Sequence, residues 1–287
     1  MKRVIALGFF DGVHLGHAAL LNKARQEADR LGCVAAVLTF AGHPDEVIFG
    51  RKTPLLNTLA QREQLMKETY GMDEVITLPF DKAMMQMPWE QFTKDILYER
   101  FAAEAVVCGH DFTFGYKGEG NAQKLREFFG ENCHVIEPVT LDGEIVSSTR
   151  IRELLQQGQV AKANDMLGRN HFLMGTVIHG KHLGRKIGIP TANTLLPDGV
   201  VVPAYGVYAA LVDGDPAVTN IGIRPTLEDG EIPTVESRVL DFNGDLYGKT
   251  IKIELLHYLR PERKFSSVEE LKEQILIDSE MTKTLLK

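Results

Sequence analysis

"RVIALGFFDGVHLGHAALLNKARQEADRLG", residues 3–32, is the segment that most clearly indicates the fold of the first half of the chain. The opening RVIALGF is a short apolar run of the kind found in buried parallel strands. The segment from His14 to Gly32 places apolar residues at helical spacing, and Gly32 is a suitable helix stop. A strand that turns directly into a helix predicts the start of a βαβ unit.

The turn between this strand and helix has the composition of an anion site. Gly12 permits a tight turn, and Gly16 keeps the helix start bare for a ligand. The helix N-terminus favours anions. His14 and His17 fall on one helical face, so both imidazoles are expected to point at one phosphate group. The alternative is a pair of surface or capping histidines beside a structural turn.

The alternation of strand-like and helix-like segments continues to about Gly168. Together they predict a Rossmann-like α/β domain with a parallel sheet. Further strands are expected at 34–40, 74–80, 103–112 and 133–139, and further helices at 58–71, 88–101, 121–130, 148–158 and 160–168.

The pattern changes in the second half, where short strands follow one another without helices. These strands predict a small antiparallel β-barrel. They are expected at 172–180, 206–214, 217–223, 234–242 and 249–259. A helix capped by Ser266 or Ser267 should end the chain. The predicted domains are therefore 1–168 and 169–287.

Bulk properties are those of a globular protein of 287 residues with a net charge of −7. The charge argues against a nucleic-acid partner, and the longest apolar runs are too short for a membrane span. Three cysteines without CxxC spacing predict reduced thiols and a cytoplasmic location. Small-molecule substrates are the expected partners, and a homo-oligomer is compatible with the sequence.

Two later segments also suit phosphate chemistry. Residues 147–152, SSTRIR, place Ser148, Thr149 and Arg152 at a helix start, where hydroxyls and a guanidinium suit a polyphosphate. An ordinary helix start with a solvated arginine is the alternative. In residues 179–194, HGKHLGRKIGIPTANT, Thr191 and Asn193 face the same way on an extended strand, so both can bind one hard cation. A Gly-rich hairpin with a basic tip is the alternative there.

The N-terminal motifs resemble those of bacterial FAD synthetases, within the HxGH nucleotidyltransferase superfamily. Residues 8–17, GFFDGVHLGH, are similar to the G-x-F-D-G-V-H-x-G-H form, and SSTRIR is similar to S-S-T-x-x-R. The resemblance implies that His14, His17 and Arg152 are catalytic. It also implies that the following residues bind ATP: Gly8, Phe10, Gly16, Ser148 and Thr149.

Two segments between these motifs are also similar to the family. TFAGHP, residues 39–44, has Gly42 where the family usually has proline, which puts the stiffness of the loop in question. GHDFTFG, residues 109–115, implies flavin contacts for Asp111 and Phe112. Core packing accounts for the phenylalanines equally well.

The C-terminal half resembles riboflavin kinases through GRKIGIPTAN, residues 184–193. The resemblance implies ATP contacts for Gly180, Gly184, Arg185 and Gly188, and a magnesium ion on Thr191 and Asn193. It implies that Glu236 is the general base. Arg260 and Phe265, in LRPERKF, are expected to contact the flavin or to order its loop.

From Val4 to about Leu276 the chain therefore resembles the bifunctional riboflavin kinase/FMN adenylyltransferase family. The resemblance implies phosphorylation of riboflavin to FMN and transfer of AMP from ATP to FMN, which gives FAD and pyrophosphate, with Mg²⁺ at both sites. Two alternatives stay open. One is an FMN adenylyltransferase whose barrel binds flavin without kinase activity, and the other is a non-enzymatic flavin sensor.

Overall fold

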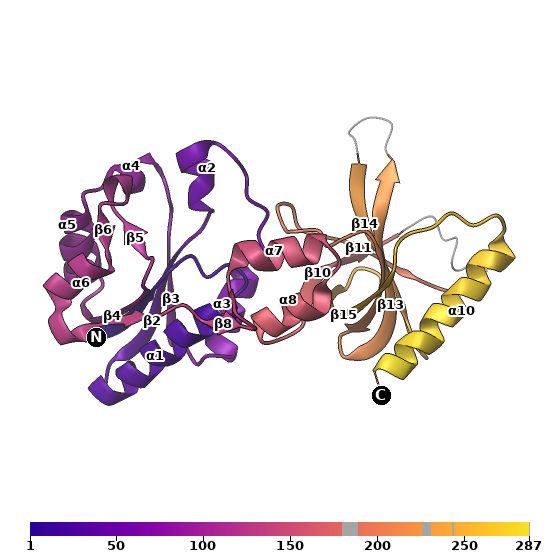
Figure 1. Ribbon diagram of the computed structural model, residues 1–287, viewed down its shortest axis with the longest axis horizontal. Coiled ribbons are helices and arrows are strands. Elements are labelled where there is room, and N and C mark those ends of the chain that lie inside the picture. Colours follow the sequence, from indigo (N-terminus) through magenta and orange to yellow (C-terminus); the bar gives the residue numbers. More distant parts are fainter. Residues whose placement is uncertain (180–188, 226–230, 243, 287) are drawn as a thin grey trace. The chain divides into compact units, whose positions relative to one another are not determined.

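The computed structural model describes residues 1–179, 189–225, 231–242 and 244–286. It forms two compact units, Met1–Ser148 and Thr149–Lys287 (Figure 1). Helix α8 (Val160–Leu167) packs against two strands of the second unit. The sequence places the boundary between functional domains at residue 168, and that placement stays a prediction.

The first unit is built on a parallel sheet with strand order β3-β2-β1-β4-β7. The strands are β1 (Arg3–Leu7), β2 (Val34–Phe40), β3 (Glu74–Leu78), β4 (Ala103–Gly109) and β7 (Cys133–Ile136). The chain winds from β1 to β3 on one side and from β4 to β7 on the other. The switch of direction lies between β1 and β4, where the carboxyl ends of the strands form a natural ligand crevice. The predicted α/β architecture is confirmed.

Helices cover both faces of this sheet because successive strand residues point to opposite sides. Val4 and Ala6 pack with α1 and α3, whereas Ile5 and Leu7 pack with η1 and α6. The helical segments are α1 (Leu15–Leu31), α2 (Pro44–Phe49), α3 (Leu59–Glu68), α4 (Lys82–Gln86), α5 (Trp89–Gln91), η1 (Phe92–Arg100), α6 (Ala122–Phe129) and the short 3₁₀ segments η2 (Tyr116–Gly118) and η3 (Gly130–Asn132). The helix expected at 88–101 is π-helical over most of its length.

Local sequence signals explain the ends of the main helices. Gly32 ends α1 in the left-handed conformation with φ 64°, as its position in the sequence indicated. Thr58 and Gln61 form a reciprocal capping box at the start of α3. Two hairpins, β5–β6 (Thr113–Phe114, Gly120–Asn121) and β8–β9 (Thr140–Leu141, Glu144–Ile145), complete the unit.

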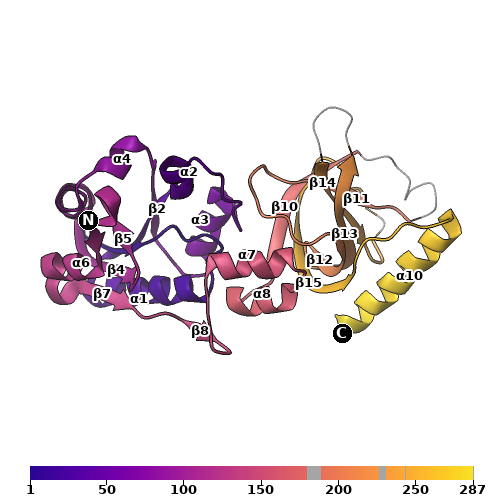
Figure 2. The same cartoon turned by 45° about the horizontal axis from the view of Figure 1, so that its top comes forward.

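In the second unit, the described residues form a closed antiparallel barrel in the order β10-β11-β14-β13-β12-β15 (Figure 2). The strands are β10 (His171–Ile178), β11 (Ala192–Leu195), β12 (Gly206–Val212), β13 (Asp215–Pro225), β14 (Glu231–Val239) and β15 (Thr250–Arg260). Helix α7 (Ser148–Gln156) precedes α8 at the start of this unit. The expected barrel is confirmed, and β11 is an additional short strand within it.

Helix α10 (Val268–Leu285) lies against β12 and β13 on the outside of the barrel. Its N-cap is Ser267, whose hydroxyl accepts a hydrogen bond from the Glu270 amide at 3.1 Å. The expected terminal helix is therefore confirmed. Among the described residues, no helix has both the length and the apolar character needed to cross a membrane.

His171, the first residue of β10, makes the stability of the barrel unit sensitive to acid. The side chain is buried, and burial lowers its pKa from 6.5 to about 3. The folded unit keeps this imidazole neutral while the unfolded chain takes up a proton below about pH 6.5, so stability falls as the pH falls.

We expect the free energy of unfolding of the barrel unit to drop by about 2 kcal/mol between pH 6.5 and pH 5 because of this group. Urea unfolding at both pH values should show this drop in the wild type and lose it in His171→Leu. His257→Leu, at a half-buried position on β15, is the control and should keep it. An equal drop in His171→Leu would contradict the assignment.

Candidate active sites

The loop after β1 has a strained backbone that its neighbours hold in place. Phe10, Gly12 and Val13 all have positive φ, at 57°, 79° and 40°. The buried Asp11 carboxylate accepts hydrogen bonds from the Leu56 amide at 2.9 and 3.1 Å. Phe10 is fully buried, so its side chain supports the loop from the core. Gly8 leaves room for that ring, because a Cβ there would lie 3.1 Å from it.

Gly12 is required both for its backbone angle and for space, since a Cβ there would lie 2.5 Å from Cδ1 of Leu56. We expect Gly12→Ala to lower the free energy of unfolding of the first unit by about 2–4 kcal/mol. Thermal or urea unfolding measures this effect. Gly32→Ala is a matched control, because φ is also positive but the Cβ would meet no atom within 4 Å. Equal losses in the two variants would refute the steric argument.

The two histidines of the loop lie against each other. His14 caps α1, and its Nδ1 accepts a hydrogen bond from the His17 amide at 3.3 Å. The two rings stack with centroids 3.7 Å apart. In the neutral form of His14, this bond leaves the proton on Nε2. The structure thus brings the pair together, with one nitrogen of His14 used in capping.

Ser148 joins this loop from the far end of the first unit. Its hydroxyl donates to the Asp11 carbonyl oxygen at 2.8 Å. Gly16 lies close to both the His14 ring and the segment just before Ser148. A Cβ at Gly16 would be 3.1 Å from the His14 ring and 3.6 Å from the Val146 carbonyl oxygen. Ser148 also begins α7, so Thr149 and Arg152 lie in the first turns of that helix.

Arg62 supports the loop from beneath, and the sequence analysis missed it. Its side chain on α3 is fully buried and donates hydrogen bonds to the carbonyl oxygens of Phe9 and Phe40. Phe9 lies just after β1, and Phe40 is the last residue of β2. The guanidinium also lies 4.4 Å from the centre of the Phe9 ring. Burial lowers the pKa of Arg62. Its spacing of four from the apolar residue Met66 was the available sequence signal.

Residues 109–115, which were expected to contact flavin in the first unit, include both exposed side chains and side chains packed in the core. The Asp111 side chain is 82% exposed and is therefore available to a ligand. Phe112 stacks on Phe114 with centroids 5.6 Å apart, and Phe114 is buried against Phe92. The rings thus belong to the edge of the core, and Phe112 remains half-buried.

In the second unit, three polar side chains stand in register on neighbouring strands. Glu236 on β14 lies opposite Asn193 on β11 and opposite Asn220 on β13. Residues directly opposite in an antiparallel sheet share one face, so these side chains are neighbours. The part of the motif at Gly180, Gly184, Arg185 and Gly188 lies outside the described residues.

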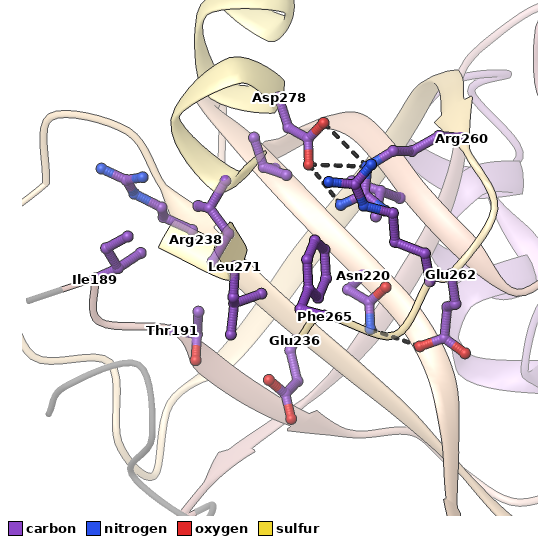
Figure 3. A pocket seen from close by; sticks show the side chains of 14 residues that line it. Ile189, Thr191, Asn220, Glu236, Arg238, Arg260, Glu262, Phe265, Leu271 and Asp278 are labelled. Carbon is purple, nitrogen blue, oxygen red and sulfur yellow. Dashed lines mark hydrogen bonds and ion pairs between the residues drawn. The ribbon is translucent and has the colours of Figure 1, made fainter. Parts of the chain in front are cut away.

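A cavity of about 200 Å³ opens beside Glu236 (Figure 3). Thr191 and Glu236 lie near each other at one end, and the Phe265 ring stands in the middle. Apolar side chains of α10, Leu271 and Ile275, contribute to the wall. The cavity therefore joins a polar end to an apolar body, as expected of a site for an aromatic ligand with a polar tail.

Arg260 and Phe265 take different places in this cavity. The Arg260 guanidinium is bound to the Asp278 carboxylate, with Nη2 2.7 Å from Oδ2. It also lies 5.9 Å from the centre of the Phe265 ring. Of the two roles expected for Arg260, this geometry favours ordering the site over direct contact with flavin.

Comparison with known proteins assigns a family to each half of the chain. Residues 1–150 match the FAD synthetase family, and residues 167–286 match the riboflavin kinase family. The bifunctional riboflavin kinase/FMN adenylyltransferase of Bacillus subtilis (strain 168) is 39% identical over 293 residues, which cover 97% of this chain and 91% of that protein. This chain belongs to the bifunctional riboflavin kinase/FMN adenylyltransferase family. The resemblance seen in the motifs is thereby confirmed.

Other relatives extend this comparison. The family member from Escherichia coli (strain K12) is 35% identical over 284 residues, 96% of this chain and 90% of its own. A crystal structure described as a macrolide-efflux protein from Streptococcus pneumoniae superposes with a TM-score of 0.90 at 32% identity and covers 98% of this chain and 94% of its own. Its description differs from the family, but the fold is shared.

Proposed function

We propose that this chain carries both reactions of its family, with Glu236 and the His14–His17 pair as the centres of the two sites. The C-terminal half of the chain phosphorylates riboflavin, and the N-terminal half, with the start of α7, adenylates the resulting FMN. The observation that supports this most is the position of Glu236, which stands opposite Asn193 and lines one cavity with Thr191 and Phe265.

In the kinase reaction, the Glu236 carboxylate accepts the proton of the riboflavin 5′-hydroxyl. That oxygen attacks the γ-phosphorus of ATP, the bond to the β-phosphate oxygen breaks, and ADP leaves. Phe265 and the apolar wall are placed to receive the flavin ring, while the polar end receives the reacting hydroxyl. The barrel therefore aligns the reactants and removes one proton.

The residues around Glu236 fit a magnesium ion. Thr191 and Asn193 supply a hydroxyl and an amide oxygen, and Mg²⁺ prefers oxygen donors together with substrate phosphates. Asn193 lies in β11, directly opposite Glu236. Thr191 comes just before β11 and lines the same cavity as Glu236. A bound Mg²⁺ would neutralise charge on the nucleotide phosphates.

In the adenylyl transfer, the FMN phosphate attacks the α-phosphorus of ATP, and pyrophosphate leaves. We assign His14 and His17 to the charge that develops at the α-phosphate. Ser148, Thr149 and Arg152 are assigned to the leaving pyrophosphate, which a helix start and a guanidinium favour. Asp111, by its exposure, is assigned to the flavin.

Incubation of the purified protein with riboflavin, ATP and Mg²⁺, followed by chromatographic separation of the flavins, tests this proposal. The proposal predicts that FMN forms first and FAD follows. FAD formed from supplied FMN, without any product from riboflavin, would support instead an adenylyltransferase with a flavin-binding barrel. No product from either flavin would contradict both.

A further inference from the structure

The apolar wall of the riboflavin cavity depends on how α10 is held against the barrel. Leu271 and Ile275 form part of that wall. Apolar packing is non-directional, so it does not by itself fix where a helix lies along a sheet. Directional contacts add a fixed point for the position of the helix and so for these side chains.

Two such contacts come from successive residues of α10. The Asp278 carboxylate accepts hydrogen bonds from Arg260 Nε at 3.1 Å and from Arg260 Nη2 at 2.7 Å. The Ser279 hydroxyl accepts one from Arg238 Nη1 at 3.2 Å. Arg260 belongs to β15 and Arg238 to β14, which flank β12 and β13 beneath the helix. The helix is thus held from both sides.

Asp278 is the more deeply buried member of the pair, with only 2% of its surface exposed. It also accepts a hydrogen bond from Gln274 Nε2 at 2.7 Å, within the same helix. A buried ion pair is weak support for stability, because desolvation offsets much of the attraction. A guanidinium and a carboxylate nevertheless fix relative position through their geometry.

The same pair reaches the aromatic side chain in the cavity. The Arg260 guanidinium lies 5.9 Å from the centre of the Phe265 ring, and the Arg263 guanidinium lies closer, at 4.7 Å. Arg260 and Phe265 line the cavity together with Asp278 (Figure 3). Asp278 therefore connects the helical wall to the ring through one guanidinium. We propose that Asp278 is a positioning residue for riboflavin, which acts through Arg260 to hold α10 and Phe265 in place.

This inference rests on the proposed kinase function, and riboflavin saturation kinetics at saturating ATP test it. Total FMN plus FAD gives the rate. In Asp278→Asn, which keeps the shape but removes the charge, the riboflavin KM should rise at least about tenfold while kcat stays within about twofold. Asp278→Glu should recover most of the loss, because the charge is retained.

Lys283→Ala is the matched control on the same helix, since it removes the exposed ion pair with Asp241. Its riboflavin KM should not change. If Asp278→Asn does not fold, Arg260→Lys takes its place, because lysine keeps the positive charge but lacks the planar guanidinium. The riboflavin KM of that variant should rise, by a factor smaller than the one expected for Asp278→Asn.

An unchanged KM in the folded Asp278→Asn variant, or a loss confined to kcat, overturns the positioning role. If Asp278→Asn does not fold, an unchanged KM in Arg260→Lys overturns it as well. A wild-type protein that makes no FMN from riboflavin overturns the proposed function itself. FMN formed by the wild type with an unchanged KM in the variant rejects this inference alone.

Discussion

Glu236→Gln should lower the rate of riboflavin phosphorylation by about 10²- to 10⁴-fold and leave adenylation of supplied FMN unchanged. Glutamine keeps the size of the side chain and its place opposite Asn193, but it no longer accepts the proton of the 5′-hydroxyl. Separate assays with riboflavin and with FMN as substrate, each resolved by chromatography, measure the two rates.

Glu254→Gln on β15 is the control for this change. Its carboxylate pairs with Lys252 at 3.1 Å and does not line the cavity, so both rates should stay near wild type. Kinase activity in Glu236→Gln within about threefold of wild type would show that another group takes the proton. A loss of both activities would show that the units do not work independently.

His17→Ala should lower adenylyl transfer by about 10²- to 10³-fold, because one group that stabilises charge at the α-phosphate is removed. The substitution keeps the backbone amide of residue 17, which donates to Nδ1 of the capping residue His14, so α1 should start at the same residue. The kinase rate of the same protein should be unchanged. FAD formed from FMN and ATP measures the first rate, and FMN formed from riboflavin measures the second.

His134→Gln provides a matched histidine in the first unit. It lies near the amino end of β7, away from the carboxyl edge of the sheet, and faces Glu27 at 3.6 Å. Adenylyl transfer should persist in that variant. A His17→Ala protein that still makes FAD at the wild-type rate would remove the histidine pair from the mechanism.

Local patterns were enough to predict most of the fold. The apolar run before Gly8 and the helical spacing up to Gly32 predicted β1 and α1, because both elements follow from short-range periodicity. The serines before the terminal helix predicted its cap in the same way. The π-helical turn at 92–100 was not predicted, since its apolar pattern is also that of an α-helix.

The arrangement of the site residues could not be predicted from the sequence, because it depends on the pairing of strands far apart in the chain. The motif indicated Asn193 and Glu236 separately, but the register that places them opposite each other comes from the barrel. Arg260 was predicted as a flavin contact or an ordering residue, and its partner Asp278 had no sequence signal. Arg62 was not singled out from the sequence, because arginine is rarely fully buried.

We infer that the two sites of this chain work independently and are linked only by FMN, which one site makes and the other consumes. The most direct test is FAD formation from riboflavin in a mixture of equal amounts of the His17→Ala and Glu236→Gln proteins. We expect that neither protein alone makes FAD at an appreciable rate and that the mixture makes it after a lag, as FMN passes through solution. A mixture that accumulates FMN but no FAD, or either variant making FAD alone at the wild-type rate, would contradict it.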